Sequence, residues 1–81
     1  MDILLFTQPN CPKCPKAKEE VLKKVQELKS IEPVNLVEID VSTEEGLFEG
    51  VQHNVLSTPT IIIKEKGHQM RLTDVSEIHS I

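Results

Sequence analysis

Two cysteines placed between an apolar run and a helical pattern constrain this chain more than any other feature. Cys11 and Cys14 are the only cysteines among its 81 residues. Residues 2–6, just before them, form a run short and apolar enough for a buried strand. Residues 12–30, just after them, repeat apolar side chains every three or four positions, as one face of a helix does. The pattern predicts a strand that leads directly into a helix, with both thiols at the start of that helix.

The rest of the chain predicts two more helices and three more strands. A segment of alternating apolar and polar residues follows the first helix, and its acidic positions suggest an edge strand. Further on, a densely β-branched segment, a turn at residues 64–67 and a second short segment predict an antiparallel hairpin. We expect strands at residues 35–41, 60–63 and 68–72, a helix over 42–54 and a helical stub that begins near Asp74.

Together these elements predict an α/β fold in one domain of residues 1–81. The element order is β-α-β-α-β-β-α, and the first crossover is expected to be right-handed, which makes strands one and two parallel. We predict a four-stranded mixed sheet in the order 2-1-3-4, with strand four as an antiparallel edge and helices on both faces. A chain of this length buries only about 60–65% of its unfolded surface, so the core must be compact.

The second helix carries its own local signals. Ser42 and Glu45 have the spacing of a capping box, which predicts that Ser42 caps the helix. Gly46 and Gly50 are expected to weaken the helix by roughly 1 kcal/mol each relative to alanine. The apolar residues of this helix form only a narrow stripe, which consists of Leu47, Phe48 and Val51.

A Cys-x-x-Cys pair that opens a helix is suited to redox chemistry for physical reasons. The helix N-terminus carries roughly half a positive charge and several free amides, which stabilise a thiolate. We therefore expect the pKa of Cys11 to fall below the usual value of about 8.5. Cys11 is expected at the exposed cap position and Cys14 on the inner face of the helix. Lys13 and Lys16 add positive charge near Cys11.

A proline at the mouth of a strand is the second unusual feature. Thr58-Pro59 precedes the β-branched strand, although proline cannot donate a hydrogen bond to a sheet. A cis peptide bond here would turn the chain sharply. It would also leave the backbone of Thr58 free to pair with an extended substrate. The sequence therefore predicts a cis proline close to the two cysteines.

These two motifs in this order resemble those of the thioredoxin/glutaredoxin superfamily. The resemblance covers nearly the whole chain and implies a thioredoxin-like fold and a thiol–disulfide oxidoreductase without a bound cofactor. It implies that Cys11 attacks the substrate disulfide, that Cys14 resolves the mixed disulfide, and that the two form a redox-active disulfide. It also implies substrate contacts from the residues around the pair, namely Pro12, Lys13, Thr58 and Pro59.

Within the superfamily, the chain looks most like small glutaredoxin-like redoxins that a flavoprotein reductase recharges with electrons from NADPH. Gln8 stands where glutathione-using members often carry lysine, and Lys13 stands where they usually carry tyrosine or phenylalanine. The usual Gly-Gly before the last helix is missing, and only Asp74 matches the acidic residue that holds the glutathione amine. The alternatives are a glutathione-dependent glutaredoxin, in which Lys13 or Arg71 supplies the missing cation, and a binding module without enzymatic activity.

Composition argues against several other classes of protein. A net charge of −4 and only two aromatic residues do not suit a nucleic-acid binder. The longest apolar runs are far too short for a membrane span, and no secretory signal is recognisable, so we expect a protein of the cytoplasm without membrane partners. We also expect a monomer without nucleic-acid partners. Two cysteines supply only half of a zinc site, and the three histidines are widely spaced, so no metal is expected.

Two surface features have more than one interpretation. Residues 11–30 contain six lysines and three glutamates, a net charge of +3. This charge fits a docking face for an acidic partner, but a solvated helix face is the simpler interpretation. An apolar rim around Cys11 is also possible, although the same residues could merely stiffen the loops. They are Pro9, Pro12, Pro15, Leu56 and Pro59.

Overall fold

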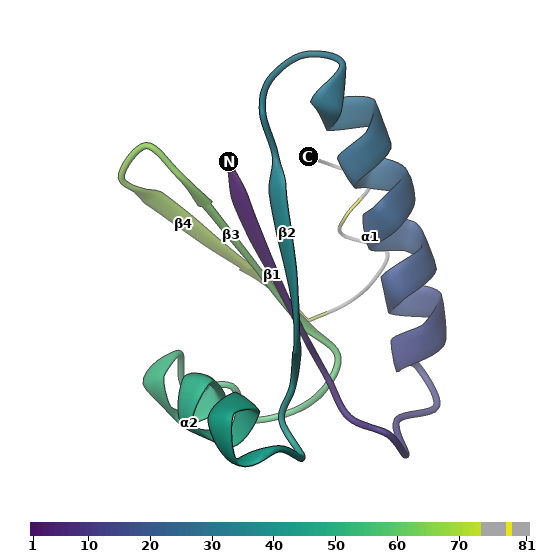
Figure 1. The fold of residues 1–81 in the computed structure, drawn as a ribbon, viewed down its shortest axis with the longest axis vertical. Coiled ribbons are helices and arrows are strands. Elements are labelled where there is room, and N and C mark those ends of the chain that lie inside the picture. The colour runs from purple at the N-terminus through teal and green to yellow at the C-terminus, as the bar shows by residue number, and fades with distance from the viewer. Residues whose placement is uncertain (74–77, 79–81) are drawn as a thin grey trace.

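The computed structural model of the chain describes residues 1–73 and residue 78. The helix predicted near Asp74 lies outside the described residues. Figure 1 shows the elements in order along the chain. They are β1 (Asp2–Thr7), α1 (Cys14–Lys29), β2 (Asn35–Asp40), α2 (Glu44–Gln52), β3 (Thr60–Glu65) and β4 (His68–Leu72). Neither of the two helices in this described part is long and apolar enough to cross a membrane.

The sheet has the predicted topology. Its strand order is β2-β1-β3-β4, with β1 and β2 parallel and with β3 antiparallel to both of its neighbours. The hairpin turn is tighter than predicted, because Lys66 and Gly67 make it alone with φ angles of 40° and 85°. A two-residue turn of this kind needs positive φ at both positions, and glycine supplies one of them without strain. Lys64 and Glu65 therefore belong to β3 and pair with β4.

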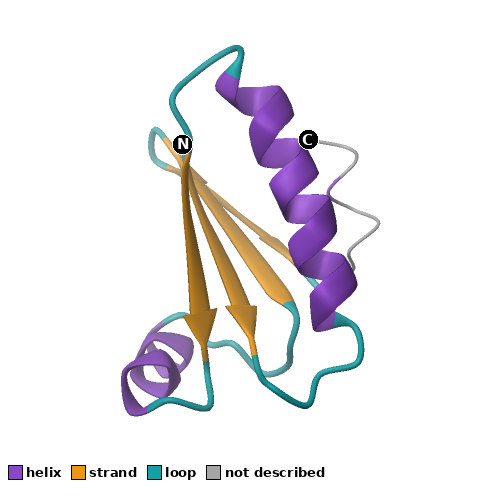
Figure 2. Ribbon diagram, turned by 45° about the vertical axis from the view of Figure 1, so that its right-hand side comes forward, coloured by secondary structure: helices purple, strands orange, loops and turns teal. Residues whose placement is uncertain are grey.

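The main core lies between α1 and one face of the sheet. In Figure 2, α1 runs alongside the strands on this face. Its buried stripe is aliphatic and meets the alternate residues of β1 and β3 that point the same way. Each fully buried aliphatic side chain of this kind contributes about 1.5–3 kcal/mol to folding. The cluster contains Ile3, Leu5, Ala17, Val21, Val25, Val34, Ile61, Ile63, Leu72 and Ile78.

The second helix lies on the other side of the sheet, at the end where β1 and β2 finish (Figures 1 and 2). Its cap is Thr43 and not the predicted Ser42, since the Thr43 hydroxyl accepts a 3.0 Å hydrogen bond from the Gly46 amide. Ser42 is used otherwise, because both its amide and its hydroxyl donate to the Asp40 carboxylate, at 2.8 and 2.6 Å. The capping-box prediction was therefore wrong by one residue.

The side of α2 that packs inward is built from glycine. Gly46 and Gly50 are its buried residues, and a Cβ atom at Gly46 would collide with the Asp40 carbonyl group. Gly46 thus permits the close approach of α2 to the end of β2. The helix propensity of glycine does not reveal this contact. The apolar stripe of this helix faces outward, and its three side chains are all more than half exposed. They are Leu47, Phe48 and Val51.

Candidate active site

The two cysteines lie where β1 gives way to α1. Two successive turns connect these elements, closed by hydrogen bonds of 3.3 Å from the Cys11 amide to the Gln8 carbonyl and from the Cys14 amide to the Cys11 carbonyl. Lys13 is the N-cap residue, and α1 begins at Cys14 with Pro15 in its first turn. The helix therefore starts two residues later than predicted, and Cys11 precedes the cap instead of occupying it.

Cys11 and Cys14 form a disulfide, with their Cα atoms 5.4 Å apart. Cys14 points inward as expected, but Cys11 was predicted to be exposed and is only 8% exposed, against 5% for Cys14. A disulfide holds its two Cβ atoms within about 3.5–4.5 Å, so Cys11 shares the sheltered side of its partner. Pro12 and Lys13, on the turn between them, are both exposed.

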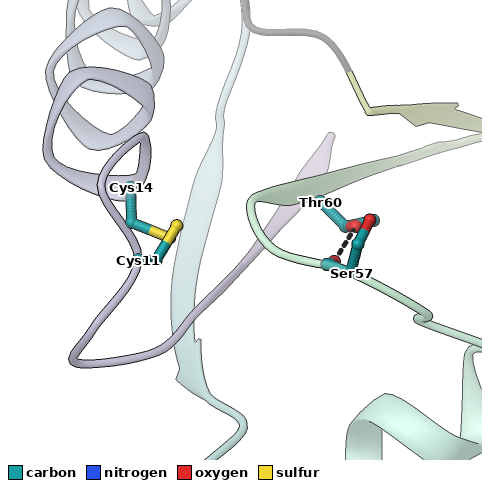
Figure 3. Close-up of a disulfide and its surroundings, with 4 residues drawn as sticks. All are labelled: Cys11, Cys14, Ser57 and Thr60. Atoms are coloured by element: carbon teal, nitrogen blue, oxygen red, sulfur yellow. Dashed lines mark hydrogen bonds between the residues drawn. A yellow bond between two sulfur atoms is a disulfide. The ribbon is translucent and has the colours of Figure 1, made fainter.

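The loop that enters β3 carries the predicted cis proline. The Thr58–Pro59 peptide bond is cis, Pro59 is buried and Thr58 is half-buried. The Thr60 hydroxyl donates a 2.6 Å hydrogen bond to the Ser57 carbonyl and ties the two sides of the proline together. Figure 3 shows this bond at the entrance to β3 and the disulfide at the start of α1. Van der Waals contact between Pro59 and the cysteines stays a prediction.

Two adjacent grooves border these loops, and Gln8 lines both of them. The groove on the α1 side is lined by both cysteines together with Thr7, Gln8, Pro9, Pro15, Lys18, Glu38 and Asp40. The groove on the α2 side reaches the proline loop and is lined by Gln8, Val41, Leu47, Gly50, Val51, Val55, Leu56, Ser57 and Thr58. A polypeptide that reacts at the disulfide could therefore extend towards α2.

Charged groups lie along the groove on the α1 side. Lys18 forms a 3.1 Å ion pair with Glu38 from β2. The Ser42 hydroxyl lowers the pKa of the nearby Asp40 carboxyl by a hydrogen bond, and the Ser42 amide adds to this effect. Asp40 therefore stays ionised, and the groove keeps a negative charge close to the cysteines.

An arginine whose role the sequence does not reveal holds the start of the proline loop. The Arg71 guanidinium, from β4, donates a 2.7 Å hydrogen bond to the Asn54 carbonyl and a second bond to the His53 carbonyl. These carbonyls belong to the C-terminal end of α2, where a cation is favoured. Only the sheet register, which sets Arg71 opposite Ile62, brings this side chain to α2.

No group of three or more potential metal ligands lies together in residues 1–73 and 78. A disulfide at a helix N-terminus, with a groove beside it, can accept electrons from one dithiol and pass them to another disulfide.

Comparisons with known proteins point to the same kind of chemistry. Residues 3–68 match the protein family described as Glutaredoxin. A curated protein of Archaeoglobus fulgidus, named "Probable Thioredoxin", is 35% identical over 77 residues, which cover 95% of this chain and 80% of that protein.

Solved structures of thioredoxins have the same fold. Thioredoxin 1 of Thermosipho africanus superposes with a TM-score of 0.81 at 23% identity, covering 99% of this chain and 88% of that one. Thioredoxin O2 of Arabidopsis thaliana, in its oxidised state, has a TM-score of 0.84 at 18% identity, covering 98% and 69%. At these identities the likeness establishes the thioredoxin-like fold, with its four-stranded sheet in the order 2-1-3-4.

Proposed function

The chain belongs to the glutaredoxin family, and from this premise we propose that it is a dithiol electron carrier that reduces disulfides in client proteins. The observation that carries the proposal is the Cys11–Cys14 disulfide at the head of α1, beside a groove that both cysteines line. A buried structural disulfide would need no such groove. A loop this short would also stabilise the fold only weakly.

The proposed reaction exchanges one disulfide for another. In the reduced protein the Cys11 thiolate attacks a client disulfide, which forms a mixed disulfide and releases one client thiolate. The Cys14 thiolate then attacks the Cys11 sulfur, which closes the Cys11–Cys14 disulfide and releases the second client thiolate. Two electrons pass to the client, and two protons from the carrier or from water leave both client sulfurs as thiols.

The division of roles is supported by where each cysteine is attached. Cys14 lies in the first turn of α1 on the same buried side as Ala17 and Val21, so the helix keeps it in place after the disulfide opens. Cys11 lies in the preceding turn, in front of the helix N-terminus, where positive potential favours a thiolate. We therefore assign the attack to Cys11 and the resolution to Cys14.

We propose that a thioredoxin-reductase-type flavoprotein, fed by NADPH, recharges the carrier. Glutathione presents two carboxylates and an amine, and each charge left partly buried without a partner costs about 1–3 kcal/mol. Gln8 lines both grooves but offers no cation. Arg71 is a poor substitute, since its guanidinium is already bonded to the end of α2. A partner protein needs only Cys11 and the exposed backbone and side chains around Thr58.

The test measures NADPH oxidation with a disulfide-containing client protein and one of two reducing systems at matched concentrations. We expect turnover with the flavoprotein reductase and little with glutathione plus glutathione reductase. The variant Gln8→Lys introduces the cation typical of glutathione-using members, so it is expected to raise the glutathione rate relative to the flavoprotein rate. Efficient glutathione turnover by the natural chain, without any from the flavoprotein, would overturn this assignment.

A glutathione-dependent glutaredoxin is the second candidate, favoured by the family match over residues 3–68. Lys13, exposed beside Cys11, is the cation that could serve it. A binding module without redox turnover is the third candidate, and a titration of the protein's free thiols after incubation with an oxidised dithiol distinguishes it. We further propose that the carrier acts as a monomeric domain in the cytoplasm, without a bound cofactor.

A further inference from the structure

The outward side of α2 is apolar although nothing in the described part of the chain covers it. Leu47, Phe48 and Val51 are 58%, 61% and 69% exposed, and Leu56 in the following loop is 95% exposed. We call these four residues the α2 ridge. Leu47, Val51 and Leu56 line one groove, and exposed apolar side chains gathered in this way on a small protein often mark an interaction site.

The ridge is continuous with the redox site. Leu47, Val51 and Leu56 line the same groove as Gln8 and Thr58. Gln8 in turn lines the groove that contains the two cysteines. An extended segment that places a disulfide at Cys11 can therefore pass Gln8 and reach the ridge.

The charge around the ridge selects the chemistry of its occupant. Glu44, Glu45 and Glu49 are the only charged residues of α2, and all three are exposed. Two apolar residues of the ridge, Leu47 and Phe48, lie between Glu45 and Glu49 in the sequence of this helix. A segment that carries aliphatic side chains flanked by lysine or arginine matches this surface in both hydrophobicity and charge.

We propose that the α2 ridge is a client-docking surface that selects disulfides flanked by aliphatic and positively charged residues. The inference rests on the proposed reduction of protein disulfides and specifies the class of client. The ridge supplies apolar contact, and the glutamates favour cationic over anionic segments. Glutathione, which is anionic, gains nothing from this surface.

The experiment uses three synthetic peptides of equal length, each with one intramolecular disulfide. The first carries leucine, valine and lysine around its cysteines, the second replaces lysine with glutamate, and the third replaces the aliphatic residues with serine. The fully reduced protein is mixed with each peptide, the reaction is quenched with acid, and the products are separated by chromatography. In each reaction, closing the Cys11–Cys14 disulfide reduces the peptide disulfide to two thiols. The second-order rate constant is the readout.

We expect the aliphatic and cationic peptide to react roughly tenfold faster than either of the other two, a difference equal to about 1.4 kcal/mol. Leu56→Ser is expected to remove most of this preference. Ile31→Ser is the matched control, because Ile31 is also strongly exposed, at 78%, but lies outside both grooves. A small linear disulfide such as 2-hydroxyethyl disulfide should react equally with both variants.

Charge is tested separately with Glu44→Lys, which is expected to lower the rate of the cationic peptide and raise that of the anionic one. Glu65→Lys, at the end of β3, makes the same charge change elsewhere and should alter neither. Thermal unfolding of each variant excludes loss of the fold as the cause.

Equal rates for the three peptides, or equal effects of Leu56→Ser and Ile31→Ser, would overturn the docking proposal while leaving the redox function intact. A sedimentation coefficient that reveals a dimer, abolished by Leu56→Ser, would overturn it in favour of a second copy as the occupant. If the reduced protein reacts with no disulfide at all, including the small one, it is the proposed function that fails.

Discussion

The two helices use their apolar side chains in opposite ways. The helix α1 buries Ala17, Val21 and Val25 against the sheet. The helix α2 buries only glycines, and its largest apolar side chains, Leu47 and Phe48, face outward. Both helices have an apolar stripe at helical spacing, so periodicity alone does not distinguish them.

This difference indicates that the two helices have different roles. The burial on α1 fixes the helix whose N-terminus carries the disulfide, so it supports the chemistry. The glycine contact on α2 holds that helix close to the end of β2 with little buried side-chain area, which leaves its apolar residues available to a partner. An exposed stripe on one of two helices in a small domain is therefore better explained by binding than by folding.

The largest expected effect is at the head of α1. Cys11→Ser should abolish disulfide reduction, because no attacking thiolate remains. Cys14→Ser should also abolish turnover, because no thiol remains to resolve the mixed disulfide. The Cys11 thiol of this variant should still attack a disulfide. Turnover with a disulfide-containing protein, the flavoprotein reductase and NADPH measures the first effect, and the matched control is Ser30→Ala at the other end of the helix. Wild-type turnover by Cys11→Ser would place the chemistry elsewhere.

The next largest effect tests the glycine contact of α2. Gly46→Ala should destabilise the protein by about 3 kcal/mol, because the new methyl group collides with the Asp40 backbone. Gly50→Ala is the matched control, since its Cβ would lie 3.5 Å from the nearest Val41 atom, an ordinary contact. It should be neutral or stabilise by up to about 1 kcal/mol through helix propensity. Denaturant unfolding measures both, and equal effects would refute the close approach of α2 to β2.

A matched pair of valines compares the two apolar stripes directly. Val21 is fully buried on α1, and Val51 is 69% exposed on α2. Val21→Ala should lower the free energy of unfolding by roughly 1.5–3 kcal/mol, through lost burial and the cavity that remains. Val51→Ala should change it by less than about 0.5 kcal/mol. A large loss of stability in Val51→Ala would mean that the outward side of α2 packs against another part of the protein.

The smallest expected effect concerns the proline loop. Thr60→Val removes the hydroxyl that bonds to the Ser57 carbonyl while keeping the shape of the side chain. The free energy of unfolding should fall by about 1 kcal/mol. Client reduction should slow, while the reaction with a small disulfide stays unchanged, since only a polypeptide needs the loop held in place. Thr73→Val, an exposed threonine beyond β4, serves as the control.

Much of the fold could be predicted because local patterns and topology rules agree. The apolar run before Cys11, the stripe on α1 and the hairpin before and after Gly67 give the order of elements, and the right-handed crossover rule leaves few arrangements. The burial of α2 could not be predicted, because the decisive contact joins Gly46 to a backbone carbonyl six residues earlier. In the sequence that glycine indicates only a weak helix.

The residues that make up the candidate site could be predicted from the sequence, but the contacts that hold its loops in place could not. Cys11, Cys14 and the cis Thr58–Pro59 bond follow from short motifs. The burial of Cys11 differs because a closed disulfide draws its sulfur towards the inner face of α1. Arg71 was considered only as a possible partner for glutathione, since its actual role depends on strand register, which brings β4 beside the end of α2.

The measurement that tests the central claim most directly is mass spectrometry of the reduced Cys14→Ser variant after mixing with an oxidised client peptide. If Cys11 is the attacking group, the variant accumulates a stable mixed disulfide with the peptide, and fragmentation places the link at Cys11. The companion variant Cys11→Ser should form no such adduct under the same conditions. An adduct that forms through Cys14 in Cys11→Ser, with none in Cys14→Ser, would contradict the account.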